Sequence, residues 1–161
     1  MRRIFRAMMI FLPLLLSCGV YTFNPKGKSD IKTIAVQPFD NKTPEFGLTD
    51  RLTEIVVDAF IADGTLKVVS AANADALLTG TLVRYERVAS VYDTSDIVQQ
   101  YKVIMSFDVA LQNPKDQTDM WKEQFTQEGP YEAATQTEED GQKLAGKRLV
   151  EAVLNKTTKS W

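Results

Sequence analysis

The most restrictive feature of the sequence is a stretch of eleven residues, 101–111, in which large apolar side chains recur at every second position. A β-strand turns successive side chains to opposite faces, so this period predicts a strand with one face in a core. The other face is mostly polar. A chain with such a strand must form a sheet that is covered on one side. The apolar series is Tyr101, Val103, Met105, Phe107, Val109 and Leu111.

Other segments are predicted to be strands because they are rich in β-branched and aromatic residues between turn-forming residues. The first strand ends near Pro38, which cannot donate a backbone hydrogen bond to a ladder. A hairpin loop is expected at 92–96, and a turn at 113–116 joins the alternating strand to the last one. The remaining predicted strands are 31–39, 65–70, 77–88 and 120–127.

Two segments show the helical period instead. In 48–60, apolar residues recur at helical spacing, and Asp63 followed by Gly64 predicts the end of that helix. A second stripe runs from Leu144 to about residue 155. Thr135 and Glu138 fit a capping box at its start.

Each amphipathic helix needs an apolar surface, and a sheet covered on one side has such a surface to offer. The sequence therefore predicts an α+β fold, a two-layer sandwich with two helices on one face of a mixed, mostly antiparallel sheet of four to five strands. The strand–helix–strand unit at 31–70 is expected to be parallel with a right-handed crossover.

The beginning of the chain predicts export. Arg2, Arg3 and Arg6 precede an apolar run at 7–16, which is too short to span a bilayer and is typical of a signal peptide. The only cysteine, Cys18, follows Ser17 and precedes Gly19, as in the lipobox of bacterial lipoproteins. An exported chain with one cysteine cannot form an internal disulfide. We therefore expect a signal peptide at 1–17, lipidation of Cys18, a polar tether at 18–30 and one domain at 31–161. By resemblance to lipoprotein sorting, Gly19 favours the outer membrane.

Composition limits the function classes. Loss of three arginines with the signal lowers the basic residues from 19 to 16 against 21 acidic ones, leaving a mature charge of −5. That charge argues against a nucleic-acid binder. The chain has no histidine, which removes the usual zinc sites and serine–histidine or cysteine–histidine catalysts. We expect no enzyme activity, no cofactor and no metal.

Several short motifs occur together in a fixed order. They are CGVYTF at 18–23, IKTIAVQPFDNKT at 31–43, LTE at 52–54, DGTLKVV at 63–69, ADALLTGTL at 74–82 and YKV at 101–103. With the lipobox, their order and spacing resemble the LptE family of lipopolysaccharide-assembly lipoproteins from residue 18 to about residue 153. The resemblance implies a non-enzymatic outer-membrane lipoprotein, facing the periplasm, that plugs the LptD β-barrel, assists barrel assembly and helps deliver lipopolysaccharide to the outer leaflet.

Lipid A phosphates attract basic side chains, so basic residues at exposed strand positions are candidate lipopolysaccharide contacts. The candidates are Arg84, Arg87, Lys102 and Lys122. No diagnostic basic motif of the family matches them. A solvated sheet face would also account for each one.

A rival interpretation comes from VQPFDN at 36–41, which also resembles the first strand of lipoproteins that form curli secretion channels or activate peptidoglycan synthases. The long alternating strand and the single last helix favour LptE. A hydrolase is the third alternative, although no nucleophile–base pair is visible.

Overall fold

The structure is a computed structural model that describes residues 31–159. The predicted signal peptide, Cys18 and the tether lie outside the described residues. The elements, in chain order, are β1 (Thr33–Val36), β2 (Asp40–Asn41), α2 (Leu48–Asp63), β3 (Lys67–Val68), a 3₁₀ turn (Ala71–Asn73), β4 (Ala76–Tyr92), β5 (Val98–Gln112), β6 (Asp119–Glu132) and α3 (Glu138–Lys159).

The strands form one mixed sheet in the order β3–β1–β4–β5–β6, with β2 beside β4 beyond the end of β1. β1 runs parallel to β3 and β4, whereas β4, β5 and β6 form an antiparallel meander. The sheet has six strands rather than the four to five predicted, because the predicted strand at 31–39 is split into β1 and β2. Pro38 lies at the break, where it cannot donate to a ladder.

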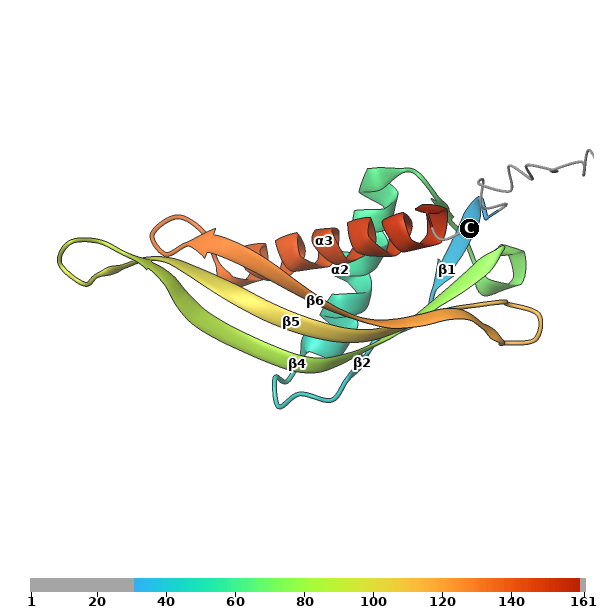
Figure 1. The fold of residues 1–161 in the computed structure, drawn as a ribbon, viewed down its shortest axis with the longest axis horizontal. Coiled ribbons are helices and arrows are strands. Elements are labelled where there is room, and N and C mark those ends of the chain that lie inside the picture. Colours follow the sequence, from blue (N-terminus) through green and yellow to red (C-terminus); the bar gives the residue numbers. More distant parts are fainter. Residues whose placement is uncertain (1–30, 160–161) are drawn as a thin grey trace, which may run out of the picture.

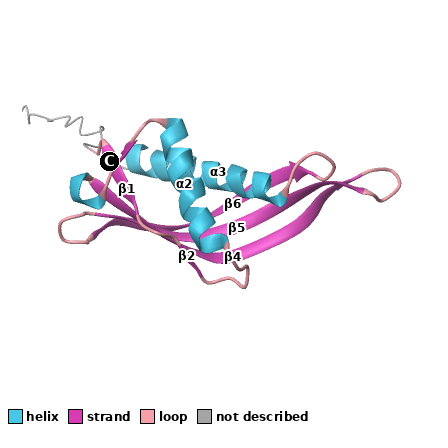
Figure 2. Cartoon of the chain, turned by 180° about the vertical axis from the view of Figure 1, so that it is seen from behind, coloured by secondary structure: helices cyan, strands magenta, loops and turns pink. Residues whose placement is uncertain are grey.

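Both helices lie on the same face of the sheet, as predicted (Figures 1 and 2). α3 lies along β6 and β5, and α2 crosses it. Gly64 ends α2 in the left-handed conformation, with φ 73°, and its N–H donates to the carbonyl of Phe60. None of the helices within 31–159 is both long and apolar enough to cross a membrane.

The core lies between the helices and the covered face of the sheet. Five alternate residues of β5, from Val103 to Leu111, are fully buried there, which confirms the face predicted from the period of two. Phe107 meets Phe39 edge to face, with ring centroids 6.3 Å apart. Leu52, Phe60 and Leu149 bring both helices into the same core.

α3 approaches β6 through two glycines that face each other. A Cβ on Gly129 would lie 1.8 Å from the carbonyl oxygen of Gly141, and one on Gly141 would lie 2.7 Å from the carbonyl oxygen of Gly129. These are backbone atoms that cannot rotate away. The close contact therefore requires glycine at both positions.

A bulge in β4 changes which residues face the helices. Leu82 is opposite Phe107, and Arg84 is opposite the next residue, Ser106, so Val83 is an extra residue in the ladder. The helix-facing positions are even-numbered up to Leu82 and odd-numbered from Tyr85 to Ala89. The imperfect alternation of this strand in the sequence has its cause in that one residue.

Candidate functional site: the open face of the sheet and the polar cluster under α3

The face of β4, β5 and β6 that points away from the helices is here named the open face (Figure 1). Its side chains form cross-strand polar pairs. The hydroxyl oxygens of Ser106 and Thr126 are 2.9 Å apart, and the Gln124 amide donates to the Asp108 carboxylate at 2.8 Å. No element within 31–159 covers this polar surface, which leaves it available to a ligand or a partner.

Three of the four basic residues selected from the sequence lie on the open face. Arg84 pairs with Glu86 at 2.8 Å, and Lys102 pairs with Glu128 at 2.9 Å. The Arg84–Glu86 pair is exposed, and the Lys102–Glu128 pair is partly exposed, with 29% of the Lys102 side chain accessible. Ion pairs at the surface contribute little to stability. An incoming phosphate could therefore replace either carboxylate at small cost.

Lys122 lies on the same face but far from Lys102. It is opposite Ala110, eight residues further along β5 than Lys102, a separation of roughly 27 Å at the usual strand rise. Lys122 lines a shallow hollow of about 540 Å³ with Lys42, Asp40 and Asp108. Arg84 is opposite Ser106, four residues along β5 from Lys102 and four from Ala110. The three cations of the open face are therefore spread along the strands, with Arg84 between Lys102 and Lys122.

Arg87 points to the opposite side of the sheet because the bulge at Val83 turns it there. Its Nε donates to the Tyr131 hydroxyl at 2.6 Å, and its guanidinium lies 4.1 Å from the centre of the Tyr101 ring. The Glu138 carboxylate lies 3.6 Å from the Arg87 Nε. The hydrogen bond to Tyr131 is the main cause that raises the pKa of Arg87. Arg87 is therefore not brought together with the other three cations.

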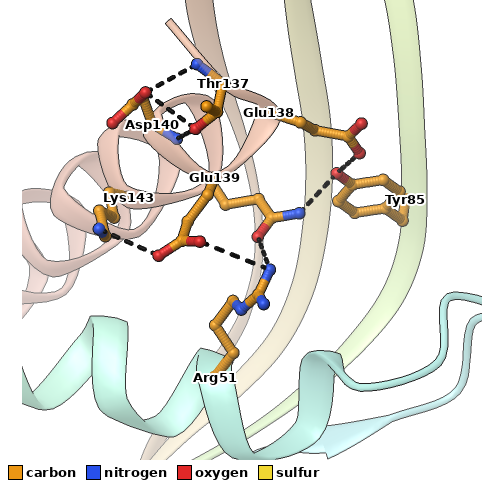
Figure 3. Close-up of polar contacts among 8 residues, drawn as sticks. Arg51, Tyr85, Thr137, Glu138, Glu139, Asp140 and Lys143 are labelled. Carbon is orange, nitrogen blue, oxygen red and sulfur yellow. Dashed lines mark hydrogen bonds and ion pairs between the residues drawn. The ribbon is translucent and has the colours of Figure 1, made fainter.

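A polar cluster next to Arg87 joins β4 to both helices (Figure 3). The Tyr85 hydroxyl donates to the Glu138 carboxylate in a short hydrogen bond and accepts from the Gln142 amide at 2.9 Å. Arg51 of α2 reaches the Gln142 carbonyl oxygen at 3.4 Å. Burial and the bond to Glu138 hold the pKa of Tyr85 well above its usual value, so the hydroxyl stays protonated. The cluster fixes the start of α3 on the sheet.

The cap of α3 differs from the sequence prediction. The Thr137 N–H and hydroxyl both donate to the Asp140 carboxylate, at 2.8 and 2.9 Å, so the capping box is Thr137 and Asp140. These bonds lower the pKa of Asp140, with the backbone N–H as the largest cause. The prediction of Thr135 and Glu138 was wrong, because Glu138 instead points to the sheet and binds Tyr85.

Sequence reasoning missed Tyr85, Tyr131 and Gln142 as members of one cluster. The two threonines at 135 and 137 begin overlapping capping patterns, and no local signal distinguishes them. The only sign of the bulge in the sequence was that apolar and polar residues stop alternating near Val83. Its position could be fixed only by the register with β5.

Comparison with known proteins identifies the family. The family model of LptE, described as lipopolysaccharide-assembly, matches residues 31–157, which is nearly the whole described domain. The chain belongs to the LptE family. This confirms the family predicted from the motifs and assigns the domain to a family of non-enzymatic lipopolysaccharide-assembly lipoproteins.

Solved structures show the same fold at low sequence identity. A protein from Xanthomonas campestris is similar with a TM-score of 0.56 and 18% identity, covering 85% of this LptE-family chain and 90% of that one. A hypothetical protein from Chlamydia trachomatis has a TM-score of 0.54 and 10% identity, with coverages of 80% and 98%. PelC from Paraburkholderia phytofirmans, a dodecamer, has a TM-score of 0.52 and 13% identity, with coverages of 74% and 86%. No curated protein matches significantly by sequence.

Proposed function

We propose that this protein is a lipid-anchored partner of the LptD β-barrel in the outer membrane, facing the periplasm. It plugs the barrel, assists barrel assembly and helps deliver lipopolysaccharide to the outer leaflet. The observation that carries the proposal is the family match over residues 31–157. The role is binding and positioning, with no bond made or broken.

The anchor is the lipid on Cys18. The cysteine stands at the end of a short apolar run and is the only one in the chain. A single acyl chain holds a protein weakly, whereas more than one holds it stably. Replacement of Cys18 by serine should leave an unprocessed precursor in the membrane fraction. A variant that is still cleaved and lipidated would contradict the anchor.

Lipopolysaccharide contacts the open face. Arg84 and Lys102 lie on it in weak surface ion pairs, and Lys122 lines the hollow. Lipid A phosphates offer more oxygens and more charge than the carboxylates that these cations now meet. Arg87 was selected with them, and its contacts with Tyr131 and Glu138 favour a role on the helix side of the sheet.

The second candidate is a channel-forming or synthase-activating lipoprotein, suggested by residues 36–41. A channel former assembles rings, and an activator binds a peptidoglycan synthase. Either partner is easily distinguished from a single large β-barrel.

The test is a photo-crosslinking pull-down of the lipidated protein from cell envelopes, with partners identified by mass spectrometry. A large outer-membrane β-barrel captured one to one supports the proposal. Capture of a synthase, or of a ring of identical copies, would replace it with the second candidate.

A further inference from the structure

The two outer edges of the antiparallel meander differ in whether their outward backbone groups are blocked. On β6, three successive backbone positions that point away from β5 are blocked. The carbonyl of Glu128 accepts from Arg148 at 2.6 Å, Pro130 has no N–H to offer, and the Glu132 N–H donates to the Gln136 side chain at 2.7 Å. Proline and covering side chains are the usual devices that prevent a sheet edge from pairing.

The corresponding edge of β4 is open over its second half. β1 and β2 pair with β4 only as far as Leu82, whose carbonyl accepts from the Lys42 N–H at 2.9 Å. Beyond that point, no strand within 31–159 pairs with this side of β4. From Arg84 to Ala89 the register with β5 is uninterrupted, so the open stretch is regular and roughly 17 Å long.

The register shows which backbone groups face outward there. Leu82 turns its carbonyl away from β5, and it is opposite Phe107. Tyr85, Arg87 and Ala89 are opposite the odd-numbered residues of β5 that precede Phe107 at every second position. In an antiparallel ladder, hydrogen-bonded pairs alternate with non-hydrogen-bonded pairs, whose N–H and C=O groups point away from the partner strand. These three residues are in non-hydrogen-bonded pairs, as Leu82 is, and they also turn their N–H and C=O groups outward.

Apolar side chains stand at both ends of this open stretch. Beyond its far end, Val91, Tyr92 and Ile97 of the hairpin tip are 45%, 56% and 60% exposed. At its near end, the loop at 42–47 leaves β2 beside β4 and carries Phe46, which is 100% exposed.

That loop is held in place by the Asn41 side chain. It accepts from the Thr43 N–H at 2.9 Å and donates to the Glu45 carbonyl at 2.7 Å. Four of the five large exposed apolar side chains of the described residues therefore border one open edge.

We propose that the edge of β4 at 84–89 accepts an extended segment of the β-barrel partner as an additional strand. The segment pairs through its backbone with Tyr85, Arg87 and Ala89, and its apolar ends contact Phe46 and the hairpin tip. Backbone pairing to an exposed edge supplies affinity, and side chains at alternate positions supply specificity. The inference rests on the function proposed above and names the surface that engages the barrel.

A second copy of this chain fits the edge less well. Antiparallel self-pairing with all three outward positions matched would place Arg87 directly opposite its own counterpart, and like charges directly opposite each other are destabilising. A foreign segment with a neutral or acidic residue at that position avoids the conflict. Glu138 lies on the same side of the sheet and already faces Arg87.

The test removes one outward N–H without changing side-chain charge. Ala89→Pro is made in the full lipidated chain, and Gln124→Pro on the β6 edge is the matched control. Each variant is first checked for normal thermal unfolding. Ala89→Pro should reduce the barrel recovered from envelopes about fivefold or more, since one hydrogen bond and the local pairing are lost, while Gln124→Pro should recover a normal amount.

Amide hydrogen exchange of the purified complex gives an independent measurement. Exchange at Tyr85, Arg87 and Ala89 should slow in the complex relative to the free protein, with little change along β6. If the barrel is recovered but these amides exchange equally fast in both states, strand addition is wrong and the proposed function stands. If no barrel is recovered with the unaltered protein, the proposed function fails and this inference fails with it.

Two other results would also overturn strand addition by the barrel. Protection of the same amides that depends on protein concentration would mean that a second copy occupies the edge. Protection in the isolated protein that disappears when residues 19–30 are removed would mean that the tether occupies it.

Discussion

The two faces of β5 (Val98–Gln112) carry different chemistry on one backbone. On the covered face, alternate residues from Val103 to Leu111 are fully buried against α2 and α3. On the open face, Lys102 and Asp108 pair with polar side chains of β6. Burial of apolar area is the main source of stability, whereas exposed polar pairs add little. The covered face therefore holds the fold together, and the open face can vary to suit a ligand.

The largest expected difference between the faces comes from neighbouring residues. Phe107→Ala should lower the free energy of unfolding by about 3–5 kcal/mol, because it leaves a cavity beside Phe39. Asp108→Ala, on the open face, should change it by about 1 kcal/mol or less. Urea unfolding of both variants measures the contrast. Equal losses would mean that the open face is also part of a packed interior.

The contact between α3 and β6 should be nearly as sensitive. Gly129→Ala places a methyl group against the Gly141 carbonyl and must push the helix off the strand, at a cost of about 2–3 kcal/mol. Gln124→Ala, on the same strand but exposed, is the control. A loss below about 1 kcal/mol for Gly129→Ala would show that the helix can shift without disturbing the core.

A smaller effect is expected at the cap of α3. Thr137→Ala should lower the free energy of unfolding by about 1 kcal/mol, because the hydroxyl bonded to Asp140 is lost. Thr135→Ala should have little effect. Thermal unfolding distinguishes them, and the reverse order would restore the capping box predicted from the sequence.

The same cap predicts a pH dependence. The pKa of Asp140 is lower in the folded protein than in the unfolded chain. Its contribution to stability is therefore present above about pH 4, the unfolded value, and is lost as the pH falls through the lowered pKa. The unfolding midpoint of Asp140→Asn should consequently fall less steeply than that of the unaltered protein between neutral and acidic pH. Parallel curves would show that the cap contributes nothing to acid sensitivity.

The smallest effect on stability, with the clearest effect on binding, is expected on the open face. Reversal of Arg84 and Lys102 to glutamate should leave unfolding within about 1 kcal/mol. It should weaken lipopolysaccharide binding by the purified domain about tenfold. Lys143→Glu with Lys147→Glu on α3 makes the same change of net charge as a control. Equal weakening by both pairs would point to net charge, and unchanged binding would remove the open face as the lipopolysaccharide site.

Much of the fold could be predicted from the sequence because the relevant signals are local. The period of two in β5 and the helical stripe of α2 follow from the geometry of the backbone itself. Gly64 marked the end of α2, and its positive φ is as expected. The family motifs likewise lie in short segments, and the match over residues 31–157 agrees with them.

The candidate site was less predictable because its arrangement depends on pairing between distant residues. The period of two places Arg84 and Arg87 on opposite faces of the sheet in any register. The register shift at Val83 decides that Arg84, and not Arg87, lies on the open face. Only the packing of α3 on β4 makes Thr137, rather than Thr135, the cap, since Glu138 is taken by Tyr85.

The sequence by itself determined which segments are strands and helices, which side of β5 is apolar and which family the domain belongs to. Those properties depend on neighbours within a few residues along the chain. The tertiary structure decided which cations share a face, how α3 is capped, and which sheet edge stays open. Each of these depends on an interaction between segments far apart in sequence, where one inserted residue or one competing hydrogen bond changes the outcome.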